Sequence, residues 1–206
     1  MKNTLLLIVM LLGAVGLKAQ TPDNFERFLM KTNDGFKIIY NGNSQSIIVD
    51  IVSTDINPIE NSDLINVNQD PIQFNLISNS AFSTTDSTVE RQKAELLGYS
   101  EYELNYIKDE LKLKISDIHK EWVTINKKLF LLWHFNMPPD NKSISQQVYL
   151  TTLCFAHAFN ISSPVSTGQN FADKKRKLTT LAQTLKLNSF KTDLAALAKQ
   201  LQAENK

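Results

Sequence analysis

Apolar and polar residues alternate most clearly in the middle of the chain, between residues 121 and 165. In an extended strand successive side chains point to opposite faces, so the run Leu129–Met137 divides into two sets. One face carries Leu129, Leu131, Trp133, Phe135 and Met137, and the other carries Phe130, Leu132, His134 and Asn136. Both sets begin apolar, which predicts a central strand covered by helices on one face and partly on the other. Neighbouring strands are expected at 119–126, 146–153 and 155–163.

The first third of the chain predicts a hairpin. Two β-branched runs, 36–40 and 46–53, flank Asn41-Gly42, a pair typical of tight turns. The segment 54–70 is rich in Asn, Asp and Pro and is expected to be a long loop, and 72–77 is expected to be a third strand. Before the hairpin, Phe25, Phe28 and Leu29 have the spacing of a short helix that docks on the body.

Helical patterns follow in two places. Ser87 with Glu90, and Ser100 with Glu103, have the capping-box spacing, and Gly98 lies where a first helix is expected to end. The second helix has one apolar stripe: Leu104, Ile107, Leu111, Ile115 and Ile118. Its end, 111–115, also alternates with a period of two and fits the start of a strand. Two C-terminal helices are predicted from the stripes Phe171, Leu178, Leu181, Leu185 and Phe190, Leu194, Leu197, Leu201.

The first residues have the pattern of a secretory signal peptide. Lys2 precedes an apolar run from Leu5 to Leu17, and Ala19 offers a small residue at a cleavage point. The run is shorter than the ~20 apolar residues of a membrane-spanning helix, so we expect export and cleavage after Ala19 and no transmembrane segment afterwards. We therefore expect residues 1–19 to be a signal peptide and the protein to be bacterial and periplasmic or extracellular.

Charge and cysteine content limit the partners. Cleavage removes Lys2 and Lys18 and no acidic residue, so 22 basic side chains become 20, against 21 acidic ones. A chain this close to neutrality gives no electrostatic reason to expect a nucleic-acid partner. One cysteine, Cys154, excludes an internal disulfide, so packing must stabilise the exported protein. We expect an α+β domain over 20–187, and a C-terminal helix over 188–206 that docks on it or is appended to it.

Candidate catalytic chemistry is sparse. Cys154 and His157 could form a nucleophile and base, but three residues apart on one strand they face opposite ways unless a turn intervenes. His119, His134 and His157 could ligate a metal with Asp117 or Glu121, yet their spacing matches no zinc motif. The basic cluster 173–177 is expected to be a solvated helix face rather than an anion site. We therefore predict no catalytic residues, no metal and no cofactor.

The order of the expected elements resembles that of the PsbP-like exported α+β proteins. The resemblance covers about residues 35–187 and includes Trp133, the Met137-Pro138 pair, Tyr149, Pro164 and a Leu-rich final helix. It implies a fold and a non-catalytic accessory role, and it carries over no functional residue. Together with the patterns above, it favours a single antiparallel sheet of about five to seven strands, packed by helices and followed by a C-terminal helical pair.

Three functions remain open on the sequence. The first is a non-catalytic binding or assembly-accessory protein, whose partner is an envelope protein or a small apolar ligand. Its candidate ligand-binding residues are Trp133, His134, Tyr149 and His157. The alternative is an envelope hydrolase or metal-dependent enzyme that uses His134 and His157 with Glu121, which requires these side chains to converge. The third is a protein that self-associates through its last helix.

Overall fold

The computed structural model describes residues 24–59, 62–78 and 88–204. The expected signal peptide therefore lies outside the described residues, and the domain boundaries stay predictions. Within the described ranges, no helix is long and apolar enough to cross a membrane.

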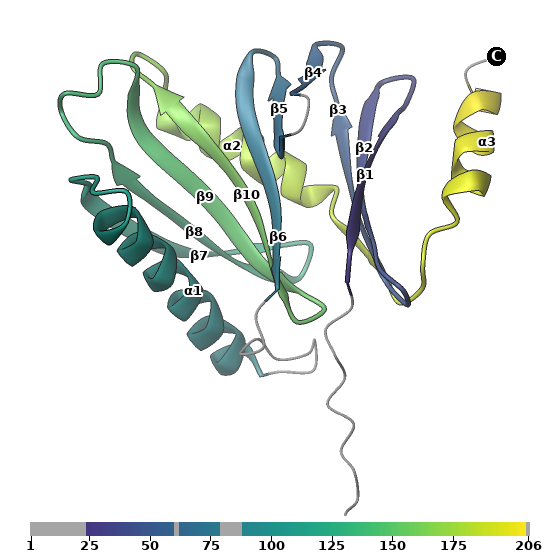
Figure 1. Cartoon of the computed structure of the whole chain (residues 1–206), viewed down its shortest axis with the longest axis horizontal. Coiled ribbons are helices and arrows are strands. Elements are labelled where there is room, and N and C mark those ends of the chain that lie inside the picture. The colour runs from purple at the N-terminus through teal and green to yellow at the C-terminus, as the bar shows by residue number, and fades with distance from the viewer. Residues whose placement is uncertain (1–23, 60–61, 79–87, 205–206) are drawn as a thin grey trace, which may run out of the picture.

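The fold is α+β, as predicted, but it contains two antiparallel sheets instead of the single sheet that we expected (Figure 1). The four-stranded sheet has the order β1 (Glu26–Lys31), β2 (Gly35–Asn41), β3 (Ser46–Val52), β11 (Lys186–Asn188). The seven-stranded sheet has the order β4 (Ile56–Pro58), β5 (Leu64–Val67), β6 (Asp70–Ser78), β10 (His157–Ser166), β9 (Ile144–Cys154), β8 (Lys128–Asn136), β7 (Ser116–Ile125). The helices are α1 (Val89–Asp109), α2 (Phe171–Gln183) and α3 (Leu194–Glu204).

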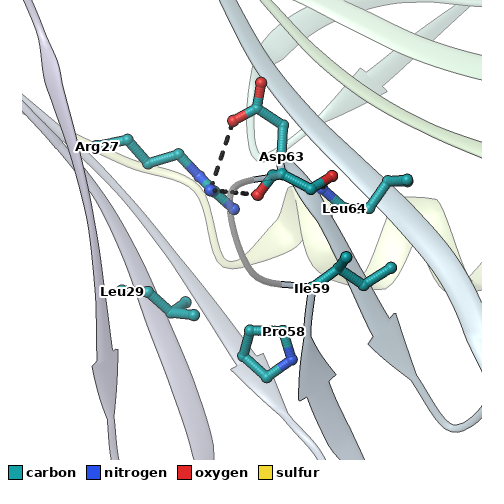
Figure 2. Close-up of a pocket in the computed structure, with 7 residues that line it drawn as sticks. Arg27, Leu29, Pro58, Ile59, Asp63 and Leu64 are labelled. Carbon is teal, nitrogen blue, oxygen red and sulfur yellow. Dashed lines mark hydrogen bonds and ion pairs between the residues drawn. The ribbon is translucent and has the colours of Figure 1, made fainter.

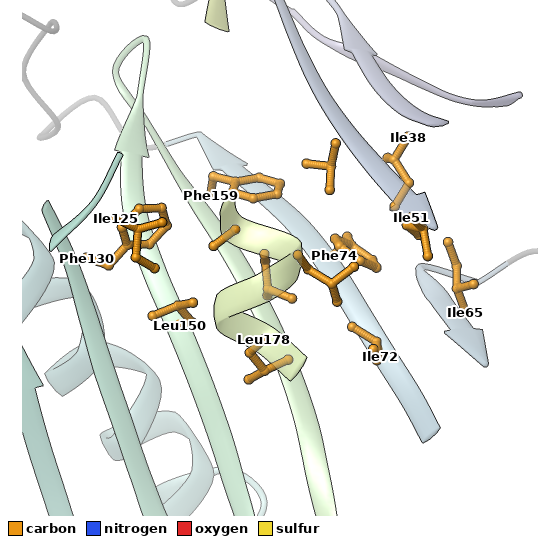
Figure 3. Close-up of a cluster of buried hydrophobic side chains, with 14 of the residues drawn as sticks. Ile38, Ile51, Ile65, Ile72, Phe74, Ile125, Phe130, Leu150, Phe159 and Leu178 are labelled. Carbon is orange, nitrogen blue, oxygen red and sulfur yellow. The ribbon is translucent and has the colours of Figure 1, made fainter. Parts of the chain in front are cut away.

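The main core lies on one face of the seven-stranded sheet, under the four-stranded sheet and α2 (Figure 3). Ile38 and Ile51 reach it from the small sheet, Phe130 and Phe159 from the large one, and Leu178 from α2. A second core on the opposite face joins α1 to Leu131, Trp133 and Phe135. β8 therefore packs on both faces, with the alternation that the sequence predicts.

Two segments near the N-terminus differ from their prediction. Residues 26–31 form β1 rather than a helix, because every residue of this segment pairs with β2, from Glu26 opposite Asn41 to Lys31 opposite Phe36. Residues 54–70 are not one long loop, since they contain β4 and β5, which extend the large sheet beyond β6. The hairpin of β2 and β3 is confirmed, with a four-residue connection closed by the Gly42 N–H and the Gln45 carbonyl at 2.9 Å.

The central helix is continuous where two helices were expected. Thr88 caps α1 by accepting a hydrogen bond from the Arg91 N–H at 3.3 Å. Gly98 lies inside the helix and does not end it, because Leu96 and Tyr99 on either side of it are buried against the large sheet. The helix ends at Asp109, so Leu111 is exposed and Ile115 belongs to the approach to β7.

Both predicted C-terminal helices are present, separated by the unexpected short strand β11. α3 lies beyond the four-stranded sheet (Figure 1). Its approach is fixed by hydrogen bonds between Asn41 and Thr192, and its end by the Asn33 side chain, which donates to the Glu204 carbonyl at 2.8 Å. Because Asn33 lies before β2 and Asn41 is its last residue, α3 extends along this strand. Phe190, expected in the last helix, precedes it and is exposed.

Candidate functional site

Two predicted site residues, Trp133 and Tyr149, lie together in the core under α1. Their rings stack in parallel, with centroids 3.9 Å apart, and Trp133 is fully buried. The indole Nε1–H donates to the Thr151 hydroxyl at 3.1 Å, and that hydroxyl donates to the Asn160 side chain at 2.9 Å. The polar group of Trp133 is thus already satisfied by the protein.

His134 points to the other face of the same sheet. Its ring lies 4.4 Å from that of Phe171 in α2 and 5.1 Å from that of His119 in β7. Burial lowers the pKa of His134 below its ordinary 6.5, His119 and Lys175 lower it further, and Glu121 opposes them. Within the described ranges, its buried Nδ1 has no hydrogen-bond partner. Glu121 itself forms an ion pair with Lys175.

His157 begins β10, directly opposite Cys154 in a tight hairpin. The turn residues Phe155 and Ala156 both have positive φ, so Cys154 and His157 face each other across the turn, whereas a continuous strand would place them on opposite faces. The imidazole Nδ1 lies 2.8 Å from the Phe155 carbonyl. Cys154 is fully buried, and burial raises the pKa of its thiol to about 12. Such a thiol is a poor nucleophile.

The predicted residues therefore do not form one site. His134 pairs with Val148 of β9 and His157 with Cys154 of the same strand, six residues apart. At ~3.3 Å per residue that separation is about 20 Å, too far for the shared catalysis that the enzyme hypothesis needs. Within the described part of the chain, no group of three or more His, Cys, Asp or Glu side chains could hold a metal ion.

A different site lies between the two sheets, where β1 faces β6 and the segment that leads into β5. Two adjoining cavities of about 360 and 370 Å³ share Arg27 and Asp63. We call them together the inter-sheet groove. Its apolar walls are Phe25, Leu29, Pro58, Ile59 and Leu76, and its polar rim includes Asn24, Asn75 and Ser78. His157 is the only predicted site residue that lines it.

Arg27 lines both cavities of this groove, and its guanidinium reaches from β1 toward Asp63 (Figure 2). Its Nη1 donates to the Ser62 carbonyl at 3.2 Å and lies 3.4 Å from the carboxylate of Asp63. Its Nε and Nη2 are buried and have no hydrogen-bond partner in the described residues. These two nitrogens present parallel N–H groups on one edge of the planar guanidinium, which is the fork that a carboxylate or phosphate binds with both oxygens.

The floor beside Arg27 is neutral. Tyr40 lies opposite Arg27 in the pairing of β1 and β2, and its hydroxyl donates to the Phe74 carbonyl at 2.8 Å. Burial raises the pKa of the Tyr40 phenol well above its ordinary 10.0, and the charge of Arg27, with a side-chain hydrogen bond from Arg27 to the phenol, only partly offsets this effect. The phenol stays protonated, so it does not neutralise the guanidinium. The Asp63 side chain, which is 55% exposed, is the only carboxylate paired with Arg27 in the described structure.

The basic cluster on α2 is only partly the solvated face that was predicted, because Asp173 and Arg176 are exposed whereas Lys174 and Lys177 make structural ion pairs. Lys174 is buried and donates to Asp70 at 2.7 Å, and Lys177 forms a second ion pair with the same carboxylate. Burial would raise the pKa of Asp70, but the hydrogen bonds from Lys174 and Lys177 prevail and lower it. These contacts hold α2 on the start of β6.

Sequence reasoning missed Arg27 because it assigned the segment around Phe25, Phe28 and Leu29 to a helix, and missed Asp63 because it assigned 54–70 to a loop. One signal was available: Phe25, Arg27 and Leu29 have the spacing of a single strand face, on which a charged residue lies between two large apolar ones. A charge on the inner face of a strand is unusual unless it has a partner or a ligand.

No family model matches this chain, and no curated protein matches it. Among solved structures, it is similar to the solution structure of cyanobacterial PsbP (CyanoP) from Synechocystis sp. PCC 6803. The alignment has a TM-score of 0.42 and 13% identity, and it covers 85% of this chain and 98% of that chain. The PsbP-like resemblance stays a prediction from the sequence.

Proposed function

We propose that this chain is an exported, non-catalytic binding protein, and that it binds a ligand with a carboxylate group in the inter-sheet groove. One observation carries the proposal: among the described residues, the Nε and Nη2 of Arg27 are buried donors without an acceptor. An unsatisfied donor on a buried charged group is destabilising by at least ~1–3 kcal/mol. A carboxylate that accepts from both nitrogens removes this penalty and adds a second, charge-assisted pair to the one that Asp63 makes with Nη1.

The walls of the groove favour a ligand with an apolar body. Phe25, Leu29 and Leu76 line it beside Arg27, so an alkyl or extended chain can bury apolar surface while its carboxylate meets the guanidinium. Asp63 holds Nη1 from an exposed position and leaves the other edge of the guanidinium free. A ligand therefore has a docking point for its charge and a surface for its chain.

Octanoate, a carboxylate with a simple alkyl chain, tests this proposal. The chain has three arginines, Arg27, Arg91 and Arg176, so the Nε–H signals of ¹⁵N-labelled protein can be assigned by substitution. We expect octanoate to shift the Arg27 Nε–H signal and the amides of Phe25 and Leu29 in a saturable titration. Octanamide has the same chain without the charge and should bind at least about tenfold more weakly.

Matched variants separate the groove from general binding. Arg27→Gln should abolish the saturable shift, whereas Arg91→Gln, on the exposed start of α1, should leave it unchanged. Equal binding of octanoate and octanamide, or of octanoate to the Arg27→Gln protein, would refute the proposal. Export is tested separately, by N-terminal sequencing of the protein recovered from cells, which should begin at Gln20.

A further inference from the structure

Among the described residues, the main chain of β1 pairs with another strand along one side only. β1 is the edge strand of the four-stranded sheet. At the turn into β2, the Thr32 N–H donates to the Gly35 carbonyl at 2.9 Å, which fixes the hydrogen-bonding phase of the pair. In an antiparallel ladder the main-chain N–H and C=O groups of every second residue face the partner strand. Counting back from Thr32, those of Met30 and Phe28 therefore bond to β2. The N–H and C=O groups of Phe25, Arg27 and Leu29 therefore point away from β2, toward the open edge.

The opposite wall of the groove offers similar groups. β6 pairs with β5 only from Asp70 to Gln73, while its pairing with β10 continues to Ser78. The Phe74 N–H donates to the Asp63 carbonyl at 3.3 Å, and the Phe74 carbonyl accepts from Tyr40, so the main-chain groups of Phe74 face the groove. By the same alternation those of Leu76 and Ser78 face it too. Both residues line the cavity.

A groove bordered by two open strand edges matches one class of ligand, because only another extended main chain offers donors and acceptors at the strand repeat. A strand that pairs with β1 places one of its side chains directly opposite Arg27, on the inner face, with Cβ atoms ~5 Å apart. A Glu or Asp at that position can reach the free Nε and Nη2. The neighbouring inner-face positions would meet Phe25 and Leu29.

We propose that the inter-sheet groove binds an extended segment of a partner protein, added as a strand to the open edge of β1, with an acidic side chain bound to Nε and Nη2 of Arg27. This inference rests on the proposed function and narrows its ligand to a peptide. Asp63, 3.4 Å from Nη1, competes with that side chain for the guanidinium.

The probe is the peptide acetyl-Val-Thr-Glu-Thr-Val-amide, which carries its two Val on the same face as its Glu, titrated into ¹⁵N-labelled protein of residues 20–206. We expect saturable shifts at the amides of Phe25, Arg27 and Leu29 and at the Arg27 Nε–H. Replacing the peptide's Glu by Gln should weaken binding about tenfold or more, because the charge-assisted pair is lost. Two further peptides carry N-methyl groups on one or the other of the two alternating sets of backbone nitrogens. Methylating the set whose N–H groups face β1 should abolish binding, whereas methylating the other set should not.

Protein variants test the same contacts from the other side. Arg27→Gln should lose binding of the Glu peptide, and Asp63→Asn should strengthen it several-fold by removing the competing carboxylate. Arg91→Gln should match the parent protein. Thermal unfolding and gel filtration of each variant show whether it remains folded and monomeric.

The other outcomes are distinguishable. If octanoate binds at Arg27 and the peptide does not, the groove is a small-molecule site, and the strand-addition inference is wrong while the proposed function stands. Equal affinity for the Glu and Gln peptides, or equal affinity for the two N-methylated peptides, would also overturn the inference. If neither probe binds and Arg27→Gln causes self-association, Arg27 only protects an edge strand, and both proposals fail.

Discussion

The substitution Gly98→Ala should stabilise the protein. Gly98 is exposed in the middle of α1, nine residues from the first helical residue and eleven from the last. A Cβ built there meets no atom within 4 Å. Alanine is favoured over glycine inside a helix by ~0.8–1.0 kcal/mol, because glycine loses more conformational freedom on folding. We therefore expect the free energy of unfolding to rise by about 1 kcal/mol, and the melting temperature by roughly 2–4 °C for a chain of this size.

Gly168→Ala provides the matched control. A Cβ at Gly168 also meets nothing within 4 Å, but the residue has a φ of +88°. Alanine strains that backbone conformation by ~1–2 kcal/mol, so this variant should be less stable than the parent. Urea unfolding followed by circular dichroism gives both values. If Gly98→Ala is neutral or destabilising while the unfolding slope is unchanged, α1 is not a continuous helix at this position.

Two further predictions concern buried groups. Asp70→Asn leaves Lys174, only 3% exposed, without its carboxylate, and should lower the free energy of unfolding by about 3 kcal/mol at pH 7 in urea titrations. Because the pKa of Asp70 is lowered in the folded state, its contribution is complete above the unfolded pKa and is lost as the pH falls through the lower, folded pKa. The parent and the variant should therefore converge in stability once the pH is below that folded value. Equal stability of the two proteins at pH 7 would show that the pair contributes nothing. The thiol of Cys154 should not react with an aromatic disulfide reagent at pH 8 in the native protein and should react fully in urea, since burial raises its pKa to about 12; rapid native reaction would mean that the β9–β10 turn opens.

The sequence predicts those elements whose buried apolar side chains recur at a regular spacing along the chain. β8 was predicted because residues 129–137 alternate between two apolar faces, and both faces are covered in the structure. α2 was predicted because Phe171, Leu178 and Leu181 form one stripe. The prediction that a helix ends at Gly98 is wrong because it rested on a local signal alone. A local signal for termination is overridden by burial of Leu96 and Tyr99 on the same helix.

The division into two sheets is not encoded in local periodicity. The strands of both sheets direct alternate apolar side chains into one shared core, so Ile51 of β3 and Ile72 of β6 look alike in sequence. Which strand pairs with which depends on contacts far apart in the chain, such as β11 with β3. The strands β4 and β11 have three residues each, which is too short for any pattern to identify them.

The candidate site depends on this same division. In a helix over 25–29, Phe25, Phe28 and Leu29 would share the buried face and Arg27 would point to solvent. In the structure, Arg27 and Leu29 of β1 share the inner face, which Phe25 continues just before the strand, so the choice of secondary structure decides whether the guanidinium is inside the protein. Pairing with β2 makes that choice, and the separation of the two sheets leaves the outer edge of β1 open. A strand edge with an inward arginine and two free donors is thus a consequence of the tertiary structure, and no short stretch of the sequence contains it.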